Sequence, residues 1–310
     1  EGLNNNLKKI GSIKFMTDPS YEQIKKIIKN YDGIFTNPNK SKVFLDKNLL
    51  KSANKLKVIC TASTGTNHID VAYAKQKKIK ILCLKEDRST INKISSTAEH
   101  AFALTFASIR NIVASFESVK KNDWDYTKFI GRQLDNLTFG IIGYGRLGKL
   151  YANYLKPFKS KIIVYDPYKN AKNKHIKQVN NINSLLKESD VISLHVHLNN
   201  ETNKMINKKS FIKMKKNVII INTSRGEIID DNDLIDFLKK FKDSKYATDV
   251  LTNEVTKSKN NKILRYSKKN SQVLITPHIG GMTKEAQEIA FNHSAKKLSY
   301  FFKNFSYSPK

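Results

Sequence analysis

Cysteine is scarce in this chain, which has only Cys60 and Cys83 among its 310 residues. Both lie in short apolar stretches that read as strands. Two thiols in a chain of this length do not suggest the disulfide framework of a secreted protein. They indicate reduced cysteines and a cytoplasmic location.

Long apolar runs are also absent. The longest run near the middle of the chain, AFALTFASI at 101–109, ends at Arg110 and is too short to cross a bilayer. No basic segment followed by an apolar stretch opens the sequence, so we predict neither a signal peptide nor a membrane partner. The first residues, EGLNNNLKKIGSIKF, read as a partial helix running into a strand, and we therefore expect a segment to precede residue 1.

Acidic residues are few: the chain has 27 acidic and 56 basic residues, which gives a net charge of +29. The excess lysine is spread along the chain and forms no single arm or stripe. It comes with no RNA-binding aromatic signature, zinc spacing or helix-turn-helix signal, so we predict no nucleic-acid partner. A mild attraction for small anionic substrates remains compatible with this charge.

Arginine is rare too, because only six of the 56 basic residues are Arg. One of them, Arg225, stands in IIINTSRGEII, between the end of an apolar run and a glycine. Because lysine is used almost everywhere else, we expect the planar guanidinium of Arg225 to have a role that a lysine ammonium could not fill.

Short β-branched runs alternate with amphipathic stretches, which predicts a parallel α/β architecture of two units. We expect early strands at 12–18, 32–37, 57–63 and 80–85, with helices starting near Tyr21, Ser41 and Ile69. One long helix is expected from Ser95 to Lys121, as a hinge between the units. Later strands are expected at 137–142, 161–166, 190–196, 217–223, 245–250 and 272–276, then a surface excursion at 256–271 and a last helix at 283–304.

A glycine-rich turn follows the strand expected at 137–142. Gly143, Gly145 and Gly148 have the G-x-G-x-x-G spacing, with an apolar strand before them and an amphipathic helix after them. Such a turn lets a pyrophosphate approach the helix N-terminus. Asp166 ends the next strand, where a carboxylate can accept hydrogen bonds from ribose hydroxyls and would repel a 2′-phosphate. The pattern predicts NAD binding, in preference to NADP.

Three further residues each follow a predicted strand: Arg225, Glu254 and His278. Alone, each has an ordinary alternative as a salt-bridge donor, a solvated loop residue or a turn residue. Together with a nicotinamide site, they fit the chemistry of a 2-hydroxy acid. Arg offers a planar fork for the carboxylate and C2 oxygen, His accepts or returns the hydroxyl proton, and Glu fixes the imidazole tautomer and stabilises the imidazolium.

These stretches resemble the D-isomer-specific 2-hydroxyacid dehydrogenase family, which includes D-lactate and D-3-phosphoglycerate dehydrogenases. The similarity rests on STGTNHID, STAEHAFALTFASIRN, IGRQLDNLTFGIIGYGRLG, LHVHLNNET, INTSRGEIID, ATDVLTNE and TPHIGG, in family order over nearly all of residues 30–300. It implies an NAD-dependent enzyme that transfers a hydride between nicotinamide and C2 of a D-2-hydroxy or 2-oxo acid. By the resemblance, Arg225 binds substrate, Glu254 orients the catalytic histidine and His278 is the acid/base.

The resemblance also implies a fold and further site residues. A Rossmann NAD-binding domain (101–285) is inserted into a flavodoxin-like substrate domain (1–100, completed by 286–310), both doubly wound around parallel sheets, and we expect a homodimer. The residues it assigns besides the catalytic three and the motif glycines are Arg146 and Leu147 at the pyrophosphate, Asp166 at the ribose, Thr97, Thr223, Ser224 and Asp249 at the nicotinamide half, Gly280 and Gly281 in the histidine loop, and Ser63, Thr64 and Gly65 at the substrate carboxylate.

Two positions depart from the family pattern. Val255 stands where a Pro usually follows the catalytic Glu, and His197 where a Pro usually stands in the LHxPL motif. His195 and His197 would share one face of a strand, but no third ligand is evident, so we predict no metal. Two alternatives stay open: a D-3-phosphoglycerate dehydrogenase specifically, or a non-catalytic scaffold that responds to NAD.

Overall fold

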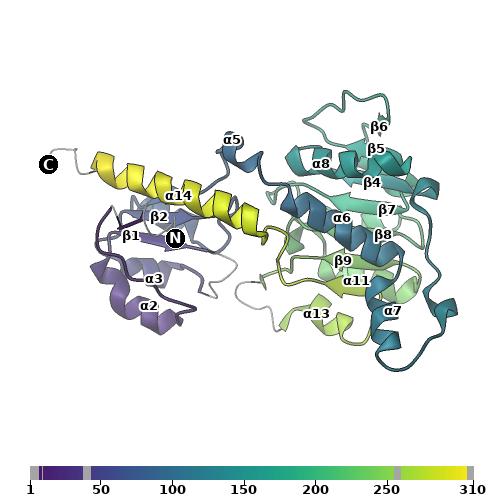
Figure 1. The fold of residues 1–310 in the computed structure, drawn as a ribbon, viewed down its shortest axis with the longest axis horizontal. Coiled ribbons are helices and arrows are strands. Elements are labelled where there is room, and N and C mark those ends of the chain that lie inside the picture. The colour runs from purple at the N-terminus through teal and green to yellow at the C-terminus, as the bar shows by residue number, and fades with distance from the viewer. Residues whose placement is uncertain (1–6, 9, 38–42, 255–259, 306–310) are drawn as a thin grey trace. The chain divides into compact units, whose positions relative to one another are not determined.

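The computed structural model describes residues 7–8, 10–37, 43–254 and 260–305 (Figure 1). The chain divides into two compact units, the first comprising residues 1–94 and 281–310 and the second residues 95–280. Within the described residues, no helix combines the length and apolarity needed to cross a membrane.

Unit 1 is built on a three-stranded parallel sheet in the order β1-β2-β3. Alternate residues of β2 point to opposite faces: Ile59 lies in the apolar cluster formed with the helices that follow β1, whereas Val58 and Cys60 pack against α14. Burial on both faces explains why β2 reads as a continuous apolar run. The elements are α2 (Tyr21–Ile27), η1 (Ile28–Asn30), β1 (Gly33–Thr36), α3 (Lys47–Lys51), β2 (Val58–Thr61), α4 (Val71–Gln76), β3 (Lys80–Leu82), α5 (Arg88–Ile91) and α14 (Lys284–Phe305).

Two predictions for unit 1 are wrong. Residues 12–18 form no strand. They pair with none of the three strands of the described sheet, and Phe15 is 61% exposed. The helix expected near Ser41 begins only at Lys47, where the Asp46 carboxylate accepts a hydrogen bond from the Leu49 N–H. Ser41 itself lies outside the described residues.

Unit 2 is a doubly wound α/β domain around a seven-stranded parallel sheet, in the order β10-β9-β8-β7-β4-β5-β6. The strand order reverses at β4, between β5 and β7, as in Rossmann domains. Figure 1 shows helices on both faces of the sheet. The strands are β4 (Thr138–Ile142), β5 (Lys161–Tyr165), β6 (Ile176–Gln178), β7 (Val191–Leu194), β8 (Ile219–Asn222), β9 (Lys245–Thr248) and β10 (Val273–Ile275).

The strand residues of unit 2 alternate between two apolar cores. Ile219 and Ile221 face α6 and α8, whereas Ile220 faces α9, α10, α11 and α13. This period of two lets one sheet bury both faces. The helices are α6 (Ser96–Ile109), α7 (Ile112–Val119), η2 (Tyr126–Phe129), η3 (Leu134–Asn136), α8 (Arg146–Leu155), η4 (Lys156–Phe158), α9 (Ile182–Glu188), α10 (Lys208–Phe211), η5 (Gly226–Ile228), α11 (Asp231–Lys240) and α13 (Lys262–Ser267).

The single helix expected at 95–121 is in fact two, α6 and α7, separated by Arg110 and Asn111. Asn111 adopts a left-handed conformation with φ of 54°, which asparagine tolerates better than most residues. The Lys245 ammonium holds this break in place. It donates to the Ser108 carbonyl (2.8 Å) at the end of α6 and to the Asn111 side chain.

Residues 256–259 of the expected surface excursion at 256–271 lie outside the described residues, and the described part is not only surface. It contains α13, whose Ile263 is 2% exposed in the core of unit 2. The short strand β6 was not predicted. It pairs with β5 at the edge of the sheet, and its few residues carry little apolar periodicity.

Candidate active site

The glycine-rich turn connects β4 to α8 and has the shape that its spacing predicts. Gly143 has φ of +92°, and a side chain there would come within 2.6 Å of the His195 carbonyl oxygen. A side chain at Gly148 would lie 2.1 Å from the Gly143 carbonyl oxygen, so this glycine lets α8 approach the turn closely. A side chain at Gly145 would meet nothing within 4 Å. Protein packing therefore explains two of the glycines, whereas the space beside Gly145 is open.

Asp166 lies at the end of β5, and its carboxylate holds the same turn. One oxygen accepts from the Tyr144 N–H (2.7 Å), in the middle of the glycine motif. The other accepts from the N–H groups of Tyr168 (2.8 Å) and Lys169 (3.0 Å). The carboxylate thus borders the turn that Arg146 and Leu147 complete at the partly exposed N-terminus of α8.

Arg225 follows β8 in a loop that its neighbours hold rigidly. The Asn222 amide donates to the Arg225 carbonyl (2.9 Å) and accepts from the Ser224 N–H (3.0 Å). The Ser224 hydroxyl donates to the carbonyl of Leu194 (2.8 Å), at the end of the neighbouring strand β7. The Arg225 guanidinium donates to the Ser224 carbonyl (2.6 Å) and its side chain is half-buried. Thr223, at 7% exposed, lies between them.

The loop that carries Glu254 packs directly against this arginine loop. A side chain at Gly226 would lie 2.2 Å from the Thr252 nitrogen, so only glycine permits the contact. The Glu227 carboxylate accepts from the N–H of Asn253 (3.0 Å), which is left-handed with φ of 54°. The residues on either side of Arg225 and Glu254 therefore set the position of both side chains together.

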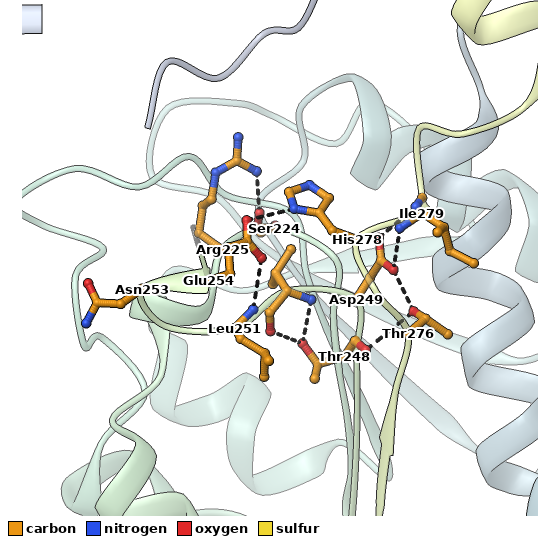
Figure 2. A network of polar contacts seen from close by, with 12 residues as sticks. Ser224, Arg225, Thr248, Asp249, Leu251, Asn253, Glu254, Thr276, His278 and Ile279 are labelled. Carbon is orange, nitrogen blue, oxygen red and sulfur yellow. Dashed lines mark hydrogen bonds and ion pairs between the residues drawn. The ribbon is translucent and has the colours of Figure 1, made fainter. Parts of the chain in front are cut away.

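His278 follows β10 and forms the central pair of the site with Glu254. Its Nδ1 lies 2.7 Å from Glu254 Oε1, while Glu254 Oε2 accepts from the Leu251 N–H (3.2 Å). With Nδ1 donating to the carboxylate, Nε2 is the nitrogen that can exchange a proton with a substrate. Figure 2 shows Arg225, Glu254 and His278 side by side, although their loops follow three different strands.

Asp249, expected at the nicotinamide half, is 2% exposed and anchors the histidine loop. Its carboxylate accepts from Thr276 Oγ1 (2.5 Å) and from the N–H group of Ile279 (2.8 Å) (Figure 2). It also accepts from the N–H group of Gly280 (2.7 Å). His100 Nε2 lies 3.3 Å away. Burial alone would raise the pKa of Asp249, but the donors from His100, Thr276, Gly280 and Ile279 prevail and lower it.

The other predicted residues lie where their motifs put them in each unit. Thr97 is in the first turn of α6, and its methyl group faces Gly280. Gly281 begins the return of the chain to unit 1, with open space where a side chain would be. In unit 1, Ser63, Thr64 and Gly65 form the turn after β2, closed by a hydrogen bond from the Ser63 hydroxyl to the Gly65 carbonyl (2.6 Å).

We expected the two histidines of the LHVH motif to lie on a strand. This prediction is wrong, because β7 ends at Leu194. His195 Nε2 shares a hydrogen bond with the Ser193 hydroxyl (2.9 Å) and the ring lies against Tyr151. Burial lowers the pKa of His195 to about 3, so the ring is neutral. His197 is exposed, and the described residues contain no group of three metal-ligating side chains. Val255 lies outside the described residues.

Sequence patterns did not single out four residues that organise this site: His100, Asn222, Glu227 and Thr276. Asn222 was detectable in principle, because it ends a run of isoleucines that reads as a buried strand. A buried polar side chain there must be hydrogen-bonded, and Asn222 is indeed 0% exposed. Glu227 and His100 carried no local signal, because their partners lie 26 and 176 residues away in the chain.

Comparison with known proteins identifies the family of this chain. Residues 102–280 match the family model for the NAD binding domain of D-isomer specific 2-hydroxyacid dehydrogenases. The chain belongs to this family. It is 36% identical over 295 residues to D-3-phosphoglycerate dehydrogenase of Methanocaldococcus jannaschii, covering 94% of this chain but 54% of that protein. It is 35% identical over 266 residues to hydroxypyruvate reductase of Thermotoga maritima, covering 86% and 83%.

Solved structures show the same fold. A D-lactate dehydrogenase from Aquifex aeolicus, in complex with NAD and lactic acid, superimposes with a TM-score of 0.82 and 31% identity, covering 97% of this chain and 91% of that one. This chain spans about half the length of the first curated dehydrogenases that it matches. The family's NAD-binding domain thus corresponds to unit 2, and the open space at Gly145, beside Asp166 and the start of α8, fits a pyrophosphate and its ribose.

Proposed function

We propose that this protein is an NAD-dependent dehydrogenase that interconverts a D-2-hydroxy acid and the corresponding 2-oxo acid. The observation that carries the proposal is the pair His278 Nδ1–Glu254 Oε1 at 2.7 Å, with Arg225 on the loop packed beside Glu254. Bound NADH supplies the hydride to C2, and the chain supplies the proton and the positive charge.

In the direction of reduction, Arg225 binds the substrate carboxylate and C2 oxygen, which orients the acid and polarises the carbonyl. His278 Nε2 gives its proton to the C2 oxygen as the hydride arrives, so the products are a hydroxy acid and NAD⁺. Glu254 accepts from Nδ1, holds the ring orientation and stabilises its protonated form. Oxidation follows the same steps in reverse.

The roles of the remaining residues are part of the same proposal. Asp166 selects NADH by accepting from the ribose hydroxyls and repelling a 2′-phosphate. We keep the domain bounds expected from the sequence, 1–100 with 286–310 for the substrate domain and 101–285 for the NAD domain, which lie within six residues of the bounds of units 1 and 2. We assign the cofactor's nicotinamide half to Thr97, Thr223, Ser224, Asp249, Gly280 and Gly281, and the substrate carboxylate to Ser63, Thr64 and Gly65.

We also propose a homodimer that works in the cytoplasm. Both cysteines are free thiols, which suits a reducing compartment. Unit 2 exposes large apolar side chains on and just after α7: Phe116 is 60% exposed, Trp124 83% and Ile130 76%. Exposed apolar side chains of this size are unfavourable in water and suit burial against a second copy. Light scattering should give twice the chain mass, and Phe116→Glu should give the monomer.

The decisive assay is NADH consumption by the purified protein with glyoxylate, pyruvate, hydroxypyruvate, branched 2-oxo acids and 3-phosphohydroxypyruvate, with NADPH in parallel. We expect turnover of at least one acid and a preference for NADH. Turnover of 3-phosphohydroxypyruvate alone would identify a D-3-phosphoglycerate dehydrogenase. NADH binding without turnover of any 2-oxo acid would contradict the proposed activity and favour a scaffold.

Variants test the assigned roles. His278→Ala should lower kcat by about 10²–10⁴-fold while NADH still binds, because only proton transfer is lost. His175→Ala is the matched control, since His175 is an exposed histidine of the same unit. Glu254→Gln should cost less than His278→Ala, because the amide oxygen still accepts from Nδ1. Full activity of His278→Ala would refute the assignment.

A further inference from the structure

Two loops that flank the glycine-rich turn are joined by one side-chain hydrogen bond. The Tyr168 hydroxyl donates to Glu201 Oε2 at 2.7 Å. Tyr168 lies in the loop after β5 and Glu201 in the loop after β7. The hydrogen bond raises the pKa of Tyr168, as expected for a phenol that donates to a carboxylate.

Sheet order determines what lies beneath this bond. Strand β4 pairs with β5 on one side and with β7 on the other, and all three are parallel. The loops after β5 and β7 therefore start about 10 Å apart, at two strand spacings, with the carboxyl end of β4 between them. Tyr and Glu side chains reaching toward each other can span this gap, and their bond then crosses the point where Gly143 begins the glycine-rich turn.

Both ends of the connection are anchored. On the β5 side, Asp166 accepts from the Tyr168 N–H (2.8 Å), and the Gln178 amide donates to the Lys169 carbonyl (2.8 Å). On the β7 side, the Asn199 side chain accepts from the Glu201 N–H (3.0 Å). Because each loop is held by its own hydrogen bonds, Tyr168 and Glu201 need little further ordering to meet.

The anchor on the β5 side is also the carboxylate assigned to the ribose. Asp166 accepts from the glycine-rich turn through the Tyr144 N–H and from the Tyr168 N–H. In doubly wound sheets, the dinucleotide lies beyond the carboxyl ends of the strands where their order reverses, which here is β4. An adenosine half bound next to Asp166 would therefore lie between the end of β4 and the Tyr168–Glu201 hydrogen bond.

We propose that Tyr168 and Glu201 form a strap that closes over the adenosine half of the bound dinucleotide and slows its release. This inference rests on the NAD site of the proposed function and adds two positioning residues to it. The strap opens when the single hydrogen bond breaks and closes when it forms again, so it retains the cofactor without a movement of either unit.

The test is the rate at which NADH leaves the full-length protein, measured by stopped-flow fluorescence after mixing with excess NAD⁺. Tyr168→Phe removes only the hydroxyl, and Glu201→Ala removes the acceptor. We expect each to raise the dissociation rate about threefold to tenfold. The double variant should be no faster than the faster single variant, because both remove the same interaction.

Tyr126→Phe is the matched control, because Tyr126 is an exposed tyrosine of the same unit at 79%, compared with 72% for Tyr168. It should leave the dissociation rate unchanged. Wild-type rates in both single variants, slower release, or effects that multiply in the double variant would each overturn the strap. If NADH binds but no 2-oxo acid turns over, the proposed activity fails while the dissociation rates still decide the strap. If NADH does not bind, both fail.

Discussion

The substitution Asp249→Asn tests whether the buried carboxylate holds the histidine loop. The Asp249 carboxylate accepts three hydrogen bonds from that loop, from the Thr276 hydroxyl and the N–H groups of Ile279 and Gly280. Asp249 is 2% exposed. Asparagine has almost the same shape but keeps only one acceptor oxygen and loses the charge. If that oxygen faces Thr276 and Ile279, the amide NH₂ faces the Gly280 N–H, and two donors oppose each other.

The size of the effect follows from these contacts. A hydrogen bond to a charged group contributes about 1.5–3 kcal/mol and a neutral one about 0.5–1.5, so two weakened bonds lose about 2 kcal/mol. The unpaired N–H of Gly280 adds about 1–3 kcal/mol. We expect the free energy of unfolding of unit 2 to fall by about 3–5 kcal/mol. For a unit of this size, that lowers Tm by roughly 10 °C.

The assay is thermal unfolding followed by circular dichroism, without NADH, so that any role of Asp249 in cofactor binding does not enter. Asp236→Asn is the control, an exposed aspartate of α11 at which we expect a change within about 0.5 kcal/mol. At pH 7, a Tm for Asp249→Asn within 2 °C (about 0.5–1 kcal/mol) of wild type would refute the loop-anchoring role.

The pH dependence gives the prediction a second signature. The folded pKa of Asp249 is lowered, so its carboxylate stabilises the fold above the unfolded pKa of about 3.9, and this stability is lost as the pH falls through the folded pKa. The difference in Tm between wild type and Asp249→Asn should therefore be full at neutral pH and shrink only below about pH 4. A difference that shrinks between pH 8 and pH 5 would point to another group.

The remaining predictions concern glycines. Gly145→Ala should change the unfolding free energy by no more than about 0.5 kcal/mol, because its side chain meets open space, yet weaken NADH binding at least about tenfold in a fluorescence titration. Gly148→Ala should mainly affect stability, lowering the unfolding free energy by about 2 kcal/mol or more, because its side chain would collide with the Gly143 carbonyl. Equal stability of Gly145→Ala and Gly148→Ala would contradict this. Gly226→Ala should push away the backbone at Thr252. We expect kcat to fall about 10²-fold with little change in NADH affinity. An unchanged kcat would show that the loops carrying Arg225 and Glu254 move independently.

Much of the fold was accessible from local patterns. Nine of the ten described strands fall within stretches that apolar runs predict, and only β6, whose three residues are Ile-Lys-Gln, had no such signal. The glycine spacing predicted the turn after β4, and the type and place of Arg225, Glu254 and His278 predicted a shared site. The strands and the glycine turn were predictable because both depend on neighbours in the sequence.

Other features depend on residues that are distant in sequence. The expected helix at 95–121 breaks at Asn111, where Lys245 from the start of β9 binds the Ser108 carbonyl and the Asn111 side chain. The strand expected at 12–18 does not form, because a strand needs a neighbouring strand to hydrogen-bond with, and this segment pairs with none of the described strands. Its own sequence could not show that. Tyr168 looked like one more exposed tyrosine until the fold placed Glu201 opposite it.

The sequence by itself therefore determined the parallel α/β class, the glycine-rich turn after β4 and the chemical groups at the strand ends, because these follow from short-range periodicity and residue chemistry. Only the tertiary structure decided which donors bind the Asp249 carboxylate, how Gly226 lets two loops pack together, and that Glu201 accepts from the Tyr168 hydroxyl. A hydrogen bond is directional and reaches about 3 Å, so whether two distant residues share one depends on how the whole sheet is ordered and twisted.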